Sequence, residues 1–140
     1  MLDKRTLHMK VQEQCDCFAT TEPLREMAAL GKEPDPEEGA LKWIALAVLH
    51  GIGRNAESIS LRRSAGGEFS VTAKYRESEL PEPPERIGRK VFDVVKAITH
   101  LEDTGRMPII IGIRDSSMEI EFNLDRDGGA EEVVLKFKAD

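Results

Sequence analysis

Residues 35–53 read DPEEGALKWIALAVLHGIG, and this stretch decides the fold. Asp35 is a favourable N-cap, Pro36 suits the first helical position, and Glu38 is placed to reach back to the cap. The apolar run that follows predicts a helix of about four turns. Gly51 is placed to end that helix in the left-handed conformation.

The predicted helix is apolar on two sides. Its apolar positions are Leu41, Ile44, Ala45, Val48 and Ile52 on one side, and Trp43, Leu46, Ala47 and Leu49 on the other. A helix that is apolar nearly all round is normally buried, and this run is shorter than the roughly 20 apolar residues of a membrane span. We therefore expect a central core helix, with Trp43 buried and with cover on both sides.

The composition is that of a soluble globular protein. The chain has 140 residues, 40% hydrophobic and 33% charged, with a formal net charge of −6. This length predicts a single domain, residues 1–140, that folds without disulfides, a metal or a cofactor. Lys4, Arg5 and His8 interrupt the apolar core that a signal peptide would need, so we expect a cytoplasmic protein.

The segment before the core helix is predicted to contain a strand and a short helix. Apolar and polar residues alternate from Leu7 to Cys17, with Glu13 as the one fault, which favours a strand. A short helix is then expected to begin near Pro23, with Thr20 or Thr21 as its cap and Gly31 at its end.

Cys15 and Cys17 are the chain's two cysteines. In a strand they would share one face about 6.6 Å apart, which is poor geometry for a disulfide. A soft-metal site needs about four Cys or His ligands, and His8 would lie on the opposite face. The sequence therefore predicts two reduced thiols and no metal site.

Two alternating segments after the core helix predict a β-hairpin. A three-residue loop, Ala65–Gly67, pairs Leu61 with Val71 and Ile59 with Ala73, which keeps apolar residues on one face. A two-residue loop would mix the faces. The longer loop is therefore preferred.

The second half begins after a proline-rich segment. Glu79–Pro84 holds three prolines and is predicted to be an internal linker. Residues 85–101 carry a clean apolar stripe typical of a surface-covering helix, which Gly105 and Pro108 are expected to stop. The isoleucine-rich run 109–113 is typical of an inner strand.

A second hairpin follows around Gly128 and Gly129. Its register sets Phe122 opposite Leu135 on one face and Glu121 opposite Lys136 on the other, so apolar and charged pairs agree. The element order predicts an α+β fold, a two-layer sandwich in which a mainly antiparallel sheet of five or six strands has helices on one face. Helix and hairpin occur twice, in 36–76 and 85–138, although the strand at 109–113 weighs against a duplication.

The most polar connection follows the isoleucine-rich strand and carries a guanidinium, a carboxylate and two hydroxyls: Arg114, Asp115, Ser116 and Ser117. Loops held by rigid strands often carry binding sites, but Asp and Ser are also ordinary turn formers. His50 and His100 lie near predicted helix ends, where an imidazolium interacts favourably with free carbonyls. No residue is assigned a catalytic role, because no catalytic motif is found.

Three functions remain open. The first is a non-catalytic interaction or regulatory domain that acts through a protein surface, and the second is a small-anion or small-ligand binder, or an enzyme, that uses the Arg114–Ser117 loop. The third is nucleic-acid binding through the cations around the first hairpin: Arg54, Arg62, Arg63, Lys74 and Arg76. The scarcity of aromatic residues and the acidic net charge argue against this third function.

The amount of apolar surface predicts self-association. Ile110, Phe92 and Val134 point away from the faces assigned to the core. The open sheet face is expected to be polar, with Ser60, Thr72, Glu119, Glu121, Lys136 and Lys138 on it. We therefore expect a two-fold homodimer through helices or an edge strand, with Leu7–Cys17 as one pairing route, and another protein as a further possible partner.

Overall fold

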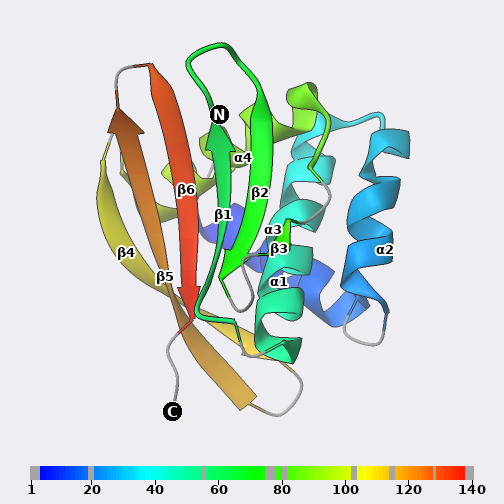
Figure 1. Cartoon of the computed structure of the whole chain (residues 1–140). Helices are drawn as coiled ribbons and strands as arrows, with labels where there is room; N and C mark the ends of the chain where they lie inside the picture. Colours follow the sequence, from blue (N-terminus) through cyan, green and yellow to red (C-terminus); the bar gives the residue numbers. More distant parts are fainter. Residues whose placement is uncertain are drawn as a thin grey trace.

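A computed structural model gives the fold of the chain (Figure 1) and describes residues 4–18, 21–54, 56–74, 78–79, 82–101, 104–113, 116–127 and 129–137. The helices are α1 (Lys4–Phe18), α2 (Pro23–Ala28), the 3-10 segment η1 (Ala29–Lys32), α3 (Pro36–Gly53) and α4 (Glu85–Thr99). The strands are β1 (Ser58–Arg63), β2 (Phe69–Lys74), β3 (Ser78–Glu79), β4 (Gly105–Ile113), β5 (Ser116–Asp127) and β6 (Ala130–Phe137). None of these helices is long and apolar enough to cross a membrane.

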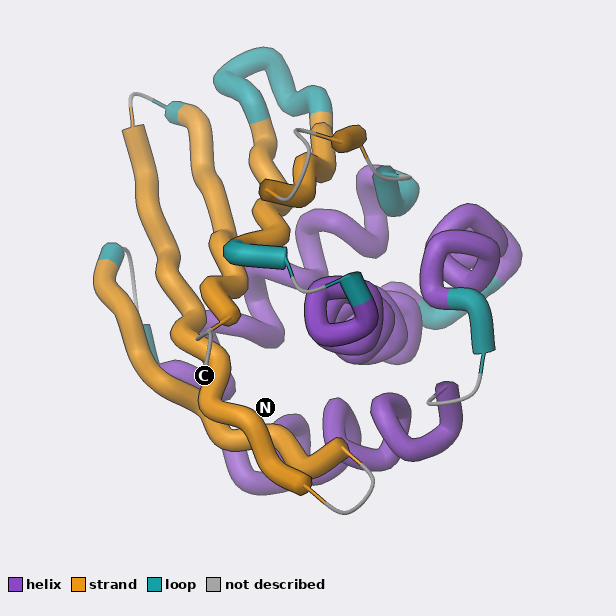
Figure 2. Tube along the Cα trace, turned by 60° about the horizontal axis from the view of Figure 1, so that its bottom comes forward, coloured by secondary structure: helices purple, strands orange, loops and turns teal. Residues whose placement is uncertain are grey.

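The six strands form one antiparallel sheet in the order β3-β2-β1-β6-β5-β4. Helices α3 and α4 are each followed by a three-strand meander, and β1 and β6 join the two meanders in the middle of the sheet. The sheet is strongly curved and the helices lie on one side of it (Figure 2). The predicted α+β two-layer fold is therefore confirmed.

The predicted core helix is confirmed as α3. The Glu37 N–H donates to Asp35 Oδ1 over 3.0 Å at its start, and Trp43 is fully buried. The expected end at Gly51 is wrong, because the helix continues to Gly53. Gly51 serves packing instead, since a Cβ there would lie 2.2 Å from the Phe137 ring.

The strand predicted at Leu7–Cys17 is wrong, because these residues lie in α1. Val11 and Cys15 are buried and Phe18 packs against the same core, which is helical spacing. Val11 and Cys15 also fit an alternating pattern. In so short a segment the helical spacing of the buried residues could not be distinguished from the alternation of a strand. Glu13, the fault in the alternation, is simply an exposed helical residue.

The short helix begins at Pro23 as predicted, but its cap was assigned wrongly. Glu22 occupies the N-cap position without a side-chain cap bond. The Thr21 hydroxyl instead donates to the Phe18 carbonyl over 2.8 Å, and so it satisfies the end of α1. Gly31 lies within η1, which continues α2.

Both predicted hairpin registers are confirmed. Leu61 pairs with Val71 in the first hairpin, where the Ser64 N–H donates to the Glu68 carbonyl over 2.8 Å and closes the loop. In the second hairpin Phe122 pairs with Leu135. Pairing of apolar faces therefore fixed the register of both hairpins.

The isoleucine-rich strand is longer than predicted and lies at the edge of the sheet, not inside it. It includes both Gly105 and Pro108, which were expected to stop the preceding helix. That helix, α4, ends earlier because His100 adopts a left-handed conformation with φ of 60°. Glu79, expected to begin the linker, pairs with Thr72 as part of β3.

The open face of the sheet is polar, as expected. The Ser60 and Thr72 hydroxyls hydrogen-bond across it over 2.8 Å, and Lys136 is exposed on it, whereas Lys138 lies outside the described residues. Phe92 was expected to point outward but is buried against Phe69, with ring centroids 6.3 Å apart.

Candidate functional site

The predicted ligand loop lies at the hairpin between β4 and β5. Arg114 and Asp115 fall outside the described residues, whereas Ser116 and Ser117 begin β5 opposite Ile113 and Gly112. The backbone of the two serines is therefore strand, not turn. A binding role for Arg114–Ser117 stays a prediction.

The same hairpin presents the long edge of the sheet. In an antiparallel strand, alternate residues direct both their N–H and their C=O away from the paired neighbour. In β4 these outward-facing residues are the even-numbered ones, which include Pro108, Ile110 and Gly112. An uncovered row of such groups is a template for pairing with another strand.

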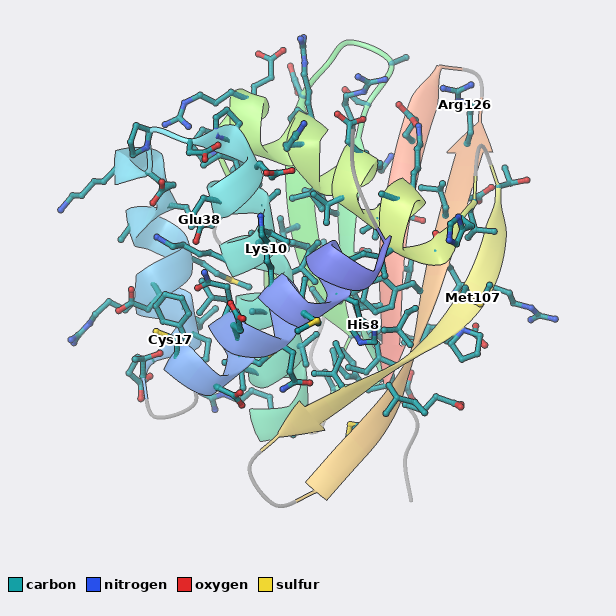
Figure 3. The ribbon with its side chains drawn as sticks, turned by 180° about the vertical axis from the view of Figure 1, so that it is seen from behind. His8, Lys10, Cys17, Glu38, Met107 and Arg126 are labelled. Carbon is teal, nitrogen blue, oxygen red and sulfur yellow. The ribbon has the colours of Figure 1, made fainter. Side chains whose placement is uncertain are left out.

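Helix α1 covers part of this edge with two side chains, of which Figure 3 labels His8. His8 Nε2 donates to the Ile110 carbonyl over 2.8 Å. The Gly112 N–H donates to Gln12 Oε1 over 2.7 Å, and the Gln12 amide nitrogen donates back to the Gly112 carbonyl. The Gln12 amide therefore forms the pair of hydrogen bonds that a neighbouring strand would form.

Exposed apolar side chains flank this contact. Among the described residues, the exposed large hydrophobic side chains are Met9, with 58% of its surface accessible, and Ile110, with 61%. Met9 follows His8 in α1, and Ile110 is the residue that His8 contacts. We call the surface formed by His8, Met9, Gln12, Ile110 and Gly112 the α1–β4 surface.

The two thiols differ sharply in environment. Both are free, with Cys15 buried and Cys17 exposed, because helical geometry separates positions that a strand would have placed on one face. Burial, helped by the charge of Asp16, raises the pKa of the Cys15 thiol to about 12. Cys15 is therefore a neutral packing residue. No three His, Cys, Asp or Glu side chains in the described part of the chain group as metal ligands.

Glu131, a carboxylate with 8% of its side chain exposed, connects a helix and several strands. Glu131 of β6 contacts Arg63 over 2.6 Å, Lys96 over 3.3 Å and Arg126 over 3.6 Å. These cations come from β1, α4 and β5. The cluster therefore ties a helix to three strands.

The cations proposed for nucleic-acid binding do not share one face. Arg63 lies on the helix-covered face with Glu131, whereas the neighbouring Arg62 must face the open side because successive strand residues alternate. Lys74 pairs with Glu57 over 3.5 Å. Arg76 lies outside the described residues, so these cations support no continuous basic stripe.

His50 lines a cavity of about 340 Å³ at the end of α3. The cavity wall also includes Arg54 and a segment from Thr21 to Leu24. Burial, with a smaller contribution from the Arg54 charge, lowers the pKa of His50. Burial thus disfavours the His50 imidazolium, and its interaction with the helix carbonyls stays a prediction. His100 lies exposed just after α4.

A wider hollow of about 640 Å³ lies between α2, the tip of the first hairpin and the start of α4. Its floor includes Met27 and Phe69, and its rim carries Glu68, Glu82 and Glu85. The described residues of this lining include no cysteine, histidine or lysine, so they offer carboxylates but no ready nucleophile.

Similarity to known proteins adds no functional assignment. The chain matches no protein-family model, and a comparison with curated proteins found no match. Sequence reasoning missed His8 and Gln12. Their four-residue spacing marks one face of a helix, but only the correct assignment of α1 would have made that signal visible.

Proposed function

We propose that this protein is a non-catalytic interaction domain that acts through the α1–β4 surface, with a second copy of the chain as its first partner. The observation that carries the proposal is the exposure of Met9 and Ile110 beside a contact that holds their two elements together. Contiguous exposed apolar surface marks protein-interaction sites, and Met9 and Ile110 form the apolar part of such a surface in this proposal.

The energetics favour Ile110 as the centre of such an interface. Full burial of an isoleucine side chain is worth about 1.5–3 kcal/mol, and a two-fold dimer would bury both copies. The open sheet face beside it is polar, with the Ser60–Thr72 hydroxyl pair as an example. The apolar contact is therefore local, and the partner is expected to cover an edge and not a whole face.

Sedimentation velocity across micromolar concentrations tests this proposal. The wild type should approach twice the 15.6 kDa chain mass, and Ile110→Lys should shift it towards the monomer. Thr72→Lys is the matched control, because Thr72 is exposed on β2, away from the β4 edge. If the wild type keeps the monomer mass at every concentration, a second copy of the chain is excluded as the partner.

A different protein partner requires a second test. A photo-reactive residue at position 110 should cross-link a partner in cells, and the same residue at position 72 should not. The affinity of the purified partner should then fall by about tenfold or more with Ile110→Lys, since about 1.4 kcal/mol of lost burial corresponds to tenfold. Equal cross-linking at both positions would contradict the proposal.

A cytoplasmic location, supported by the free thiols, belongs to the same proposal.

The second candidate is small-anion binding, which the His50 cavity favours. A neutral imidazole and the Arg54 guanidinium line the same cavity, and guanidinium groups are strong partners for carboxylate and phosphate. Titration with inorganic phosphate should shift the His50 ring resonances in the wild type but not in Arg54→Ala. If Arg54→Ala retains the shift, the anion binds elsewhere, and Arg114–Ser117 becomes the next site to test.

A further inference from the structure

We infer that the hollow between α2, the tip of the first hairpin and the start of α4 is a second docking surface, which takes a basic segment of a partner protein. The stems of the partner's arginine or lysine side chains lie on the apolar floor, and their charges reach the carboxylates of the rim. The site is separate from the α1–β4 surface, because none of the described residues that line it belongs to α1 or β4.

The floor of the hollow is apolar and firmly held. Phe69 is half-buried, and its ring centroid lies 6.3 Å from that of Phe92. A Cβ at Gly88 would lie 2.7 Å from the Phe69 ring, so only a glycine there lets the ring rest directly on α4. Met27 and Pro83, which also line the hollow, are buried. A partner therefore meets a preformed surface and loses little entropy in ordering it.

The wall formed by residues 82–84 cannot bind a partner as an added strand. Pro83 and Pro84 have no N–H to donate, and Pro84 is extended, with φ of −56° and ψ of 151°. The Pro84 carbonyl already accepts from the Ile87 N–H over 2.9 Å and from the Gly88 N–H over 2.8 Å. Recognition at this wall therefore depends on side chains and not on a backbone ladder.

The rim carries exposed carboxylates, and two of them have no cation beside them. Glu85 lies in the first turn of α4, where a negative charge is favourable, and it pairs with Arg89. Arg86 donates to a backbone carbonyl of η1 over 3.1 Å. In the part of the chain that the structure describes, no cation pairs with Glu68 or Glu82. These two carboxylates are therefore available to a partner.

An apolar floor below unpaired carboxylates selects the chemistry of the occupant. Arginine and lysine have an apolar stem and a charged end, so one side chain can lie on Phe69 and reach the rim. A guanidinium also stacks on an aromatic ring and binds a carboxylate through two hydrogen bonds. The described lining holds no cation, and the net charge of −6 attracts a basic partner from a distance.

The shape of the hollow favours a peptide segment over a small cation. Small-molecule sites bury about 70–90% of their ligand, whereas Glu68, Glu82 and Glu85 are exposed, so this hollow is a groove open to solvent. Its volume of about 640 Å³ has room for several neighbouring side chains. The occupant is therefore a segment in which basic and apolar residues lie close together.

Fluorescence anisotropy with a labelled peptide of alternating arginine and leucine tests the chemistry on the full chain. This peptide should bind more tightly than a peptide of alternating arginine and serine, which keeps the charge and loses the apolar side chains. A peptide of alternating glutamate and leucine should not bind. If the serine peptide or spermine binds as tightly as the leucine peptide, the apolar floor is not used and the inference is overturned.

Ala28→Lys tests the location. Ala28 is exposed and lines the hollow, so a lysine there supplies the rim with a cation from the chain itself. Ala29→Lys is the matched control, because it makes the same change of charge at an exposed neighbour that does not line this hollow. Ala28→Lys should weaken binding of the arginine-leucine peptide about fivefold or more relative to Ala29→Lys. Equal binding by the two variants would place the peptide elsewhere and refute the inference.

Removal of the two unpaired carboxylates completes the test. Glu68→Gln together with Glu82→Gln should weaken binding about fivefold or more, and added salt should narrow this difference. The matched control is Glu13→Gln together with Asp16→Asn, which removes two charges from exposed positions of α1. If both double variants keep a folded circular dichroism spectrum and weaken binding equally, the peptide responds only to net charge and the groove is no docking site.

Discussion

Gly39→Ala tests how closely α3 and α4 pack. A Cβ at Gly39 would lie 2.6 Å from Ile87 Cδ1 and 2.8 Å from Ile87 Cγ1. Ile87 is fully buried in the first turns of α4, so its side chain has no free space to occupy. Overpacking of this kind typically costs about 1–3 kcal/mol.

Gly53→Ala is the matched control in the same helix, because nothing lies within 4 Å of a Cβ at Gly53. Both substitutions gain up to about 1 kcal/mol of helix propensity, so this gain largely cancels between them. We therefore expect Gly39→Ala to unfold with a free energy about 1–3 kcal/mol below that of Gly53→Ala. Urea denaturation followed by circular dichroism measures both values.

A double-mutant cycle identifies Ile87 as the cause. Ile87→Ala alone should cost about 2–5 kcal/mol, and adding Gly39→Ala should recover part of that loss, because the new methyl group enters the space that Ile87 left. A coupling of about 0.5–3 kcal/mol is expected for residues in contact. If Gly39→Ala is as stable as Gly53→Ala, or if the cycle shows no coupling, the close approach of the two helices is refuted.

Three further outcomes are expected. Trp43→Ala should lower the unfolding free energy by about 3–5 kcal/mol, and wild-type tryptophan emission near that of free indole would contradict the burial of Trp43. Glu131→Gln should cost about 1.5–3 kcal/mol, with little dependence on salt because a nearly buried pair is screened weakly; a urea midpoint equal to that of the wild type would exclude the ion cluster as a stabilising element. The pKa of Cys15 is raised from 9.0 to about 12 in the folded state, so its contribution to stability is complete below pH 9 and is lost as pH rises towards 12. Cys15→Ser should remove that slope, whereas Cys17→Ser should keep it.

The sequence was sufficient wherever the signal was local. The α3 cap at Asp35 and the register of Phe122 with Leu135 depend on residues close together in the chain, and both were predicted correctly. The Leu7–Cys17 segment failed because Val11 and Cys15 satisfy both a helical and an alternating pattern. Only the packing of this segment against α3 in the folded protein distinguishes the helical interpretation from the alternating one.

The edge position of β4 was hidden for a similar reason. Ile109 and Ile111 are buried by helices on one face, and such burial looks the same in a sequence whether a strand lies beside β4 or not. His8 and Gln12 act on residues a hundred or more positions away. No local pattern could connect them to β4, and so the candidate surface emerged only from the fold.

The seam between β1 and β6 sets an order for folding on the ribosome. β1 can pair with β2 as soon as the first hairpin emerges, but its other side pairs with β6, which follows α4, β4 and β5 in the chain. During synthesis the backbone groups on that side of β1 stay unpaired, and together with the alternating apolar residues of β1 they can pair with a strand of another chain. Contacts so distant in sequence also slow folding. The nascent chain is therefore expected to need its greatest protection from aggregation in the interval before β6 is made.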